Sequence, residues 1–288
     1  MVKGIWFSEE HTTGASFAFK IEEQLYSEQS EFQLIEVFAT KEFGRVLVMD
    51  GCIMLSDKDE FIYHEMLVHV PLAVHPRVRK VLIVGGGDGG CLRELIRYPE
   101  IESIELVEID EAVVLTAKRF FPQLAIGYED PRVKVIYDDG LRYVRQNEQS
   151  YDLIIVDSTD PFGPGESLFT KEFYGHCLAR LNADGIMVNQ HESPYYRENA
   201  EEVSLIYAKT STVFPLVRCY QAHIPMYPSG HWLFGFLSRK YDPVKDHNRE
   251  RWEQRGLKTL YYNSDLHTGS FALPNYVRAL FSQAKAEY

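Results

Sequence analysis

Cysteine is scarce in this chain, and the spacing of the cysteines argues against a disulfide-rich scaffold and a structural zinc cluster. The 288 residues include four cysteines, Cys52, Cys91, Cys177 and Cys219, and no CxxC pair. A disulfide-rich scaffold needs a dense set of cysteines, and a structural zinc cluster needs ligand pairs only a few residues apart. We therefore expect no disulfide framework, no zinc cluster and a reducing, cytoplasmic setting.

Positive charge and long apolar runs are also lacking. Lys and Arg number 30 against 42 Asp and Glu, which gives a net charge of -12. Because nucleic-acid binding depends on basic side chains that neutralise phosphates, we expect no nucleic-acid partner. The negative net charge favours cationic ligands, or it serves solubility alone. No apolar run is long enough to span a bilayer, and the N-terminus has no signal-like apolar core, so we expect no membrane partner.

The pattern of apolar residues changes near residue 80. Residues 1–55 alternate apolar and polar side chains between turns at 41–44 and 50–51, which predicts a small antiparallel sheet. From the apolar run 80–84 onward, strand-like segments alternate with helical ones, which is typical of a doubly wound, mostly parallel sheet. The sequence therefore predicts an N-terminal β-hairpin sheet domain over 1–55 and a Rossmann-like α/β domain over 56–288.

Two segments of the larger domain carry weaker patterns. Residues 57–70 have helical periodicity and an acidic first turn, and Pro71 follows near the expected end of the helix. Residues 241–255 are charged and contain a proline, which predicts a surface excursion before a last strand.

Carboxylates follow the expected ends of four parallel strands. Asp88 lies in the turn GGGDGG after the first strand, Glu108 ends the second, Asp139 follows the third, and Asp157 ends the fourth. In open α/β sheets, ligands bind outside the carboxyl ends of the strands. The sequence therefore predicts a ligand site whose rim is acidic.

The glycine-rich turn indicates the charge of the ligand. Glycines let a ligand approach the backbone, and Asp88 would repel a pyrophosphate or a carboxylate but attract an ammonium; a helix-capping or solvent-facing Asp is the structural alternative. Glu108 is placed to accept hydrogen bonds from ribose hydroxyls. Asp139 fits recognition of the adenine amine, and a simple turn at residues 138–140 stays open. Together these residues favour a nucleoside with a cationic tail.

The segment 157–169, DSTDPFGPGESLF, contains a second acidic pair. Asp157 and Asp160 leave a buried strand and precede two prolines and two glycines, a composition that suits a mobile lid. The pair can hold an amine or act as an acid–base site. A metal site is the alternative, but the segment has no His and Asp array with ligand spacing, so we expect no metal.

Several short segments, taken in order, make the chain resemble spermidine synthase, of the polyamine aminopropyltransferase family, over nearly its whole length. They are YHEM (63–66), GGGDGG (85–90), VEID (107–110), DDG (138–140), DSTDPFGPGESLF (157–169), IPMYPSG (224–230) and FALP (271–274). The resemblance implies a sheet of the S-adenosylmethionine-dependent methyltransferase type in the larger, catalytic domain. It implies transfer of an aminopropyl group from decarboxylated S-adenosylmethionine to putrescine, which gives spermidine and 5′-methylthioadenosine. It implies no prosthetic group, since the decarboxylated donor is a co-substrate, and a homodimer or homotetramer.

The resemblance also assigns site residues position by position. Those that resemble the donor site are Gln33, Asp88, Glu108, Asp139, Gly140 and Pro164. Those that resemble the acceptor site are Tyr63, His64, Asp88, Asp157, Asp160, Gln190 and Tyr227. Asp157 resembles the catalytic proton acceptor, Asp88 would hold the aminopropyl ammonium, and Pro164 would pack on the base. Glu192 and Glu166 are candidates for holding the distal ammonium of the acceptor.

Two departures from the family pattern concern the acceptor side. Met226 stands where the family often has threonine, and Gln190 lies in the variant context NQHESPYY. Agmatine and cadaverine therefore stay open as acceptors beside putrescine. His64 as a structural histidine also stays open, whereas Cys91 and Trp232 are expected to pack in the core.

Two functions outside this activity stay open as well. An S-adenosylmethionine methyltransferase would share the sheet, the glycine turn and Glu108, but Asp88 and the pair Asp157 and Asp160 count against it. A non-catalytic polyamine-binding protein would share the acidic rim, and Asp157 counts against that reading.

Overall fold

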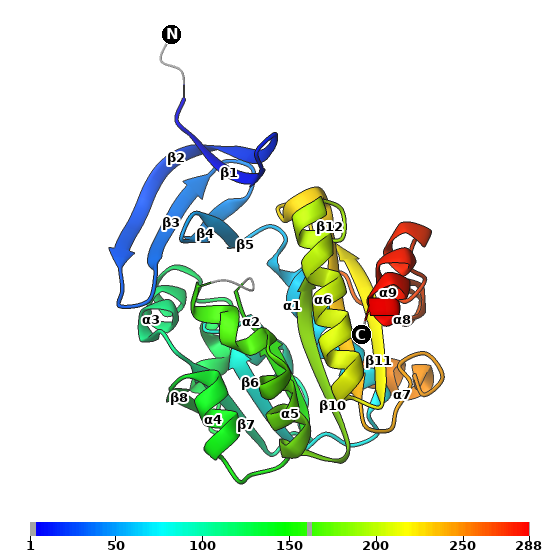
Figure 1. Cartoon of the computed structure of the whole chain (residues 1–288). Coiled ribbons are helices and arrows are strands. Elements are labelled where there is room, and N and C mark those ends of the chain that lie inside the picture. Colours follow the sequence, from blue (N-terminus) through cyan, green and yellow to red (C-terminus); the bar gives the residue numbers. More distant parts are fainter. Residues whose placement is uncertain (1–3, 160–162, 288) are drawn as a thin grey trace.

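The N-terminal part of the chain forms a five-stranded antiparallel sheet (Figure 1). The structure is a computed structural model that describes residues 4–159 and 163–287. Neighbours along the chain pair throughout, so the predicted hairpins at 41–44 and 50–51 are confirmed. In sheet order, the strands are β1 (Trp6–Thr12), β2 (Ala15–Gln29), β3 (Leu34–Thr40), β4 (Gly44–Met49) and β5 (Cys52–Ser56).

The second sheet has seven strands in the order β11-β12-β10-β9-β6-β7-β8. Its strands are β6 (Lys80–Gly85), β7 (Ser103–Glu108), β8 (Val133–Tyr137), β9 (Tyr151–Asp157), β10 (Leu181–Glu192), β11 (Leu216–His223) and β12 (His231–Ser238). β6 pairs in parallel with β7 on one side and with β9 on the other, and β12 is antiparallel to both of its neighbours. The chain thus reverses its winding between β6 and β9, which confirms the doubly wound, mostly parallel sheet.

Helices cover both faces of this sheet (Figure 1). They are α1 (Glu60–Val74), α2 (Gly90–Leu95), α3 (Glu111–Phe120), α4 (Gly140–Gln146), α5 (Lys171–Arg180), α6 (Arg197–Val213), α7 (Arg249–Gln254), α8 (Ser264–Ser270) and α9 (Asn275–Glu287), with 3₁₀ turns η1 (Ala125–Glu129), η2 (Gly163–Phe169) and η3 (Pro228–Gly230). Val81 and Ile83 of β6 pack with α1 and α2, whereas Leu82 and Val84 pack with α5, as the alternation of side chains along a strand requires. No helix in the described part of the chain is long and apolar enough to cross a bilayer.

Apolar contacts join the two sheets. Val113 of α3 packs with Ile35 and Val37 of β3. The residue before α3, Asp110, caps the helix with a side chain that accepts a hydrogen bond from the Ala112 amide. The N-terminal sheet and the seven-stranded sheet therefore face each other across one space. The predicted domain boundary at residues 55 and 56 falls inside β5 and stays a prediction.

Two of the segment predictions need correction. No strand follows residues 241–255 among the described residues. The last strand is β12, which lies between β10 and β11, and the chain then continues into α7, α8 and α9. The helix expected over 57–70 runs instead from Glu60 to Val74 and passes through Pro71. Nearly every residue of α1 is buried, so tertiary packing holds the helix together past a residue that lacks an amide donor.

Candidate active site

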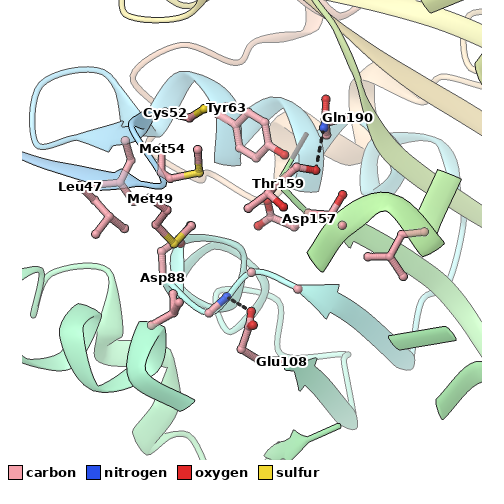
Figure 2. A pocket seen from close by; sticks show the side chains of 18 of the residues that line it. Leu47, Met49, Cys52, Met54, Tyr63, Asp88, Glu108, Asp157, Thr159 and Gln190 are labelled. Atoms are coloured by element: carbon pink, nitrogen blue, oxygen red, sulfur yellow. Dashed lines mark hydrogen bonds between the residues drawn. The ribbon is translucent and has the colours of Figure 1, made fainter. Parts of the chain in front are cut away.

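A pocket lies where the N-terminal sheet faces the carboxyl ends of β6, β7 and β9. Figure 2 shows apolar side chains of the β4–β5 hairpin, Leu47, Met49 and Met54, on one side of it. Glu108 and Asp157 enter from the strand ends of the parallel sheet. The pocket therefore has one apolar wall, suited to a flat ring, and one acidic wall.

Backbone contacts between the glycine turn and β9 set the geometry of the acidic wall. Gly85 lies opposite Asp157 in the parallel register, and the Gly86 amide donates to the Asp157 carbonyl at 2.8 Å. Gly85 has a φ of 82°, and a Cβ there would overlap that carbonyl, so no other residue fits. This close approach brings side-chain atoms of His64, Asp88 and Asp157 within 4.8 Å of one another.

Asp157 lies at the centre of this group. Its Oδ2 accepts a hydrogen bond from the Cys91 thiol at 3.2 Å, and the Tyr63 phenol also contacts its carboxylate. Burial, followed by the charge of Asp88, raises the pKa of Asp157 to about 6. Asp157 is therefore a better proton acceptor than an exposed aspartate. Cys91 is fully buried, as expected for a packing residue, and its thiol also serves Asp157.

Asp88 has a different environment from Asp157. Its Oδ1 accepts from the Gly90 amide at 2.6 Å and lies 3.3 Å from Nε2 of His64. Although burial acts in the opposite direction, the His64 cation lowers the pKa of Asp88 below its ordinary value. The carboxylate therefore stays ionised next to Asp157.

Glu108 is buried at the end of β7. Its two oxygens accept hydrogen bonds from the amides of Gly87, at 3.2 Å, and Asp110, at 2.9 Å. Burial dominates these contacts and raises the pKa of Glu108 to about 7. A ligand that donates hydroxyl groups to this carboxylate would favour its ionised form.

The other residues assigned to the donor also line the pocket. Gln33 is buried and donates from Nε2 to Asp110 at 3.0 Å. Asp139 accepts from the Arg142 amide at 2.6 Å and so caps α4, whose first residue is Gly140. Asp139 thus has a capping role besides its place in the pocket.

The aromatic side chains and the amide assigned to the acceptor also line the pocket. The rings of Tyr63 and Tyr227 lie 6.0 Å apart, and the Tyr227 hydroxyl donates to the Met54 carbonyl at 2.6 Å. Trp232 is buried, as expected, but it also lines the pocket, with its ring 4.7 Å from that of Tyr227. Gln190 donates to the Thr159 carbonyl at 3.3 Å, which is drawn in Figure 2. These groups line the part of the pocket beside Asp157, which we call the slot.

Ten of the twelve predicted site residues line one pocket. The ten are Gln33, Tyr63, His64, Asp88, Glu108, Asp139, Gly140, Asp157, Gln190 and Tyr227. Asp160 lies outside the described residues, as does the side chain of Pro164. The roles assigned to all twelve stay predictions.

Several pocket residues were missed by sequence reasoning. Glu9 of β1 and Asp59 line the pocket, but nothing in the local pattern of either residue marks it. The methionines of the β4–β5 hairpin were missed as well, although an apolar hairpin near a nucleoside site is a signal for them.

Three residues discussed on the acceptor side lie elsewhere. Among the described residues that line the pocket, neither Glu166 nor Glu192 is present; the Glu192 carboxylate accepts from Asn199 and from the Ser193 amide. Met226 is fully buried against the N-terminal sheet, in a cluster with Phe38. The departure at Met226 therefore concerns packing between the two sheets.

Comparisons with known proteins agree with this geometry. Residues 60–248 match the family model of the spermine/spermidine synthase domain, and residues 5–57 match that of the spermidine synthase tetramerisation domain. A polyamine aminopropyltransferase of Alkaliphilus oremlandii is 57% identical over 97% of this chain and 98% of its own, and one of Clostridium botulinum is 55% identical over 98% and 99%. The structure also superposes on a spermidine synthase in complex with the transition state analogue AdoDATO, with a TM-score of 0.94, 39% identity and 98% of each chain covered.

A second solved structure supports the same assignment. The spermidine synthase of Thermotoga maritima gives a TM-score of 0.91 at 37% identity, over 98% of this chain and 96% of its own. The sequence relatives and solved structures cover nearly the whole chain, and the family models match residues 5–57 and 60–248. The chain belongs to the spermidine synthase family of polyamine aminopropyltransferases.

Proposed function

We propose that this enzyme transfers the aminopropyl group of decarboxylated S-adenosylmethionine to putrescine, giving spermidine and 5′-methylthioadenosine. The observation that supports this most directly is the convergence of Asp88 and Asp157 on one point, in a pocket with an apolar wall. An acidic centre suits two cationic substrates, one carrying a sulfonium and the other carrying ammonium groups.

The donor occupies the deep part of the pocket in this proposal. Glu108 accepts the ribose hydroxyls, and Gln33 and Asp139 flank the nucleoside. The methionines of the β4–β5 hairpin cover the base from the N-terminal sheet. Asp88 then binds the ammonium of the aminopropyl tail, and a donor that carried a carboxylate there would be repelled.

The reaction is a displacement at the carbon next to sulfur. The amine nitrogen of the acceptor forms a bond to that carbon, the carbon–sulfur bond breaks, and its electron pair neutralises the sulfonium. The leaving group is a neutral thioether, so it needs no general acid. The proton lost by the amine passes to Asp157, whose raised pKa of about 6 makes that transfer less unfavourable. Tyr63 and Tyr227 orient the reacting amine.

The second ammonium of putrescine needs an anion of its own at the outer end of the slot. We assign this role to Glu9 of β1 in place of Glu192 and Glu166, because Glu9 lines the pocket and the other two do not. Its carboxylate is held by the Ile53 amide at 2.8 Å. The distance between two anions then selects acceptors by length, which distinguishes putrescine from cadaverine and agmatine.

We also propose that the chain assembles as a homotetramer through its N-terminal sheet. Residues 5–57 match the family model of the spermidine synthase tetramerisation domain, and the neighbouring apolar side chains of Ile5 and Trp6 in this segment are 73% and 61% exposed. Light scattering after size exclusion should give four times the chain mass of 33.3 kDa. A homodimer or a monomer would contradict this assembly.

A panel of amines tests the reaction. Each of putrescine, cadaverine, agmatine and spermidine is incubated with decarboxylated S-adenosylmethionine, and mass spectrometry measures the product and 5′-methylthioadenosine. Putrescine should give the highest kcat/KM, with spermidine as the product. Methyl transfer from S-adenosylmethionine would instead support the methyltransferase alternative, and binding without turnover would support a polyamine-binding protein.

A further inference from the structure

His64 of α1 lies between two carboxylates in the floor of the pocket. Its Nδ1 is 2.8 Å from Oε2 of Glu60, and its Nε2 is 3.3 Å from Oδ1 of Asp88. The side chain is 2% exposed, so water does not serve either nitrogen in place of these partners. A neutral imidazole donates from one nitrogen only, whereas an imidazolium donates from both. The arrangement therefore holds His64 as a cation.

Glu60 is in turn fixed by a guanidinium. Arg93 of α2 makes two hydrogen bonds to it, Nη1 to Oε1 at 2.6 Å and Nη2 to Oε2 at 3.0 Å. The Nε of Arg93 donates to Glu94 at 2.8 Å, and Glu94 pairs with Arg97 as well. Charges thus alternate from the pocket outward, and each buried ion has a partner of opposite sign.

The position of the imidazole is fixed by sterics as well. The ring lies on Gly90, where a Cβ would overlap its atoms, and the edge of Tyr63 packs against it at 5.4 Å between ring centres. His64 therefore has no room to turn away from Asp88.

The cation does not serve the two pocket carboxylates equally. Nε2 of His64 lies against Asp88, whereas Asp157 receives its hydrogen bonds from Cys91 and Tyr63. Two neighbouring carboxylates disfavour the ionisation of both, and a cation paired with one of them decides which stays charged.

We propose that Glu60, held by Arg93, is a positioning residue that fixes His64 as an imidazolium against Asp88, so that Asp88 stays an anion for the donor ammonium and Asp157 takes the proton of the acceptor amine. The assignment of the two substrates rests on the proposed function. The charge state of His64 rests on the geometry alone.

The electrostatics of the group agrees with this division. Although burial opposes it, the charges of Asp88 and Glu60 raise the pKa of His64 well above its ordinary value, and His64 lowers the pKa of Asp88. The pKa of Asp157 moves the other way, to about 6. The groups that face His64 are Glu60 and Tyr63 on α1, Asp88 in the glycine turn, Cys91 and Arg93 on α2 and Asp157 on β9.

The variant Glu60→Gln tests the charge state of His64 directly. It removes the anion and leaves the Arg93 cation, still paired with Glu94, near the ring, so burial should lower the His64 titration midpoint by roughly 3 pH units. NMR of protein labelled with ¹³Cε1-histidine reads that midpoint, and His64→Gln assigns the signal. A neutral His64 in the unmodified enzyme at pH 7.5, or an unchanged midpoint in Glu60→Gln, would overturn the proposal whether or not the enzyme makes spermidine.

Kinetics test the division of roles. Once His64 loses its proton, no cation offsets the repulsion between Asp88 and Asp157. The pKa of Asp157 then rises, so the acidic limb of kcat/KM for Glu60→Gln should move to higher pH by about one unit. The affinity for the decarboxylated donor, relative to that for 5′-methylthioadenosine, should fall over the same pH range, because only the donor carries the ammonium. An acidic limb that does not move, or equal losses for both ligands, would refute the role.

Two matched variants separate positioning from general stability. Glu60→Asp keeps the charge, so its acidic limb should lie close to that of the unmodified enzyme. Glu94→Gln breaks the same network two residues farther from His64, so it should lower the melting temperature and leave the limb in place. A limb that moves as far in Glu94→Gln as in Glu60→Gln would show a general loss of structure and contradict the proposal.

Discussion

Replacing Asp157 by asparagine removes the proposed proton acceptor and keeps its shape. The side chain lies at the end of β9, where its Oδ2 accepts from the Cys91 thiol at 3.2 Å. Asparagine fits the same space and offers an oxygen acceptor, but it takes no proton at neutral pH. The nucleoside contacts at Glu108 are untouched. The substitution therefore separates chemistry from donor binding.

The structure sets the size of the expected effect. Proton transfer from an alkylammonium to an ordinary aspartate is uphill by about 9 kcal/mol. With the pKa of Asp157 raised to about 6, the same transfer is uphill by about 6 kcal/mol. Burial and the charge of Asp88 thus lower the cost by about 3 kcal/mol. Loss of a general base typically lowers kcat by about 10²- to 10⁴-fold, and we expect a loss in that range.

Initial rates of 5′-methylthioadenosine release at saturating putrescine measure kcat, and calorimetry measures donor affinity. In the unmodified enzyme, kcat/KM should fall as the pH drops through about 6, because Asp157 becomes protonated there. The residual activity of Asp157→Asn should lack this inflection, and donor affinity should change by no more than about threefold, since the variant keeps the nucleoside contacts. Equal losses in kcat and in donor affinity, or an inflection near pH 6 that persists in the variant, would remove Asp157 from the chemical step.

Three other substitutions probe the same pocket. Glu108→Gln should flatten the pH dependence of the melting temperature of the ligand-free enzyme. The protonated form of Glu108 stabilises the fold fully below about pH 4.5, and this contribution is lost as the pH rises through about 7. Glutamine has no such titration. The substitution should also weaken 5′-methylthioadenosine binding, which thermal shift and calorimetry measure. Gly90→Ala should lower the free energy of unfolding by about 1–3 kcal/mol, measured by urea denaturation, because its methyl group overlaps the confined His64 ring. Cys91→Ala should move the acidic limb of kcat/KM to higher pH, because Asp157 loses a donor to its ionised form.

Each of these substitutions has a defined control or contradicting outcome. Gly175→Ala on α5, where an added Cβ meets no atom within 4 Å, should stabilise the enzyme by about 0.5–1 kcal/mol, so a loss there equal to that of Gly90→Ala would argue against the steric explanation. Cys91→Ser keeps a donor and should leave the limb near its original pH. A Glu108→Gln enzyme whose melting temperature changes with pH as much as that of the parent between about pH 4.5 and 8 would show that the carboxylate is ionised at little cost.

Local sequence patterns were enough to predict the strands, helices and hairpins of this fold. The alternation of strands and helices after residue 80 and the hairpins before it follow from side-chain periodicity and turn residues, and both sheets confirm them. Asp88, Glu108 and Asp157 were found because strand ends in a parallel sheet meet at one edge, so position along the chain is enough to bring them together.

Contacts between distant segments were beyond the reach of those patterns. Glu9 enters the pocket from β1, Met226 fills the junction with the N-terminal sheet, and β12 inserts between β10 and β11 as the last strand of the chain that the structure describes. Each depends on how two separately formed units pack, and no periodicity within either unit carries that information.

Charge states belong to the tertiary structure for the same reason. Asp88 and Asp157 are the same residue type on neighbouring strand ends, and the sequence by itself determines that both are present. Only packing decides that His64, backed by Glu60 and Arg93, lies against Asp88 and lowers its pKa, while burial raises that of Asp157. A carboxylate takes its proton affinity from the solvent it has lost and the charges around it, and both are fixed when α1, α2 and β9 come together.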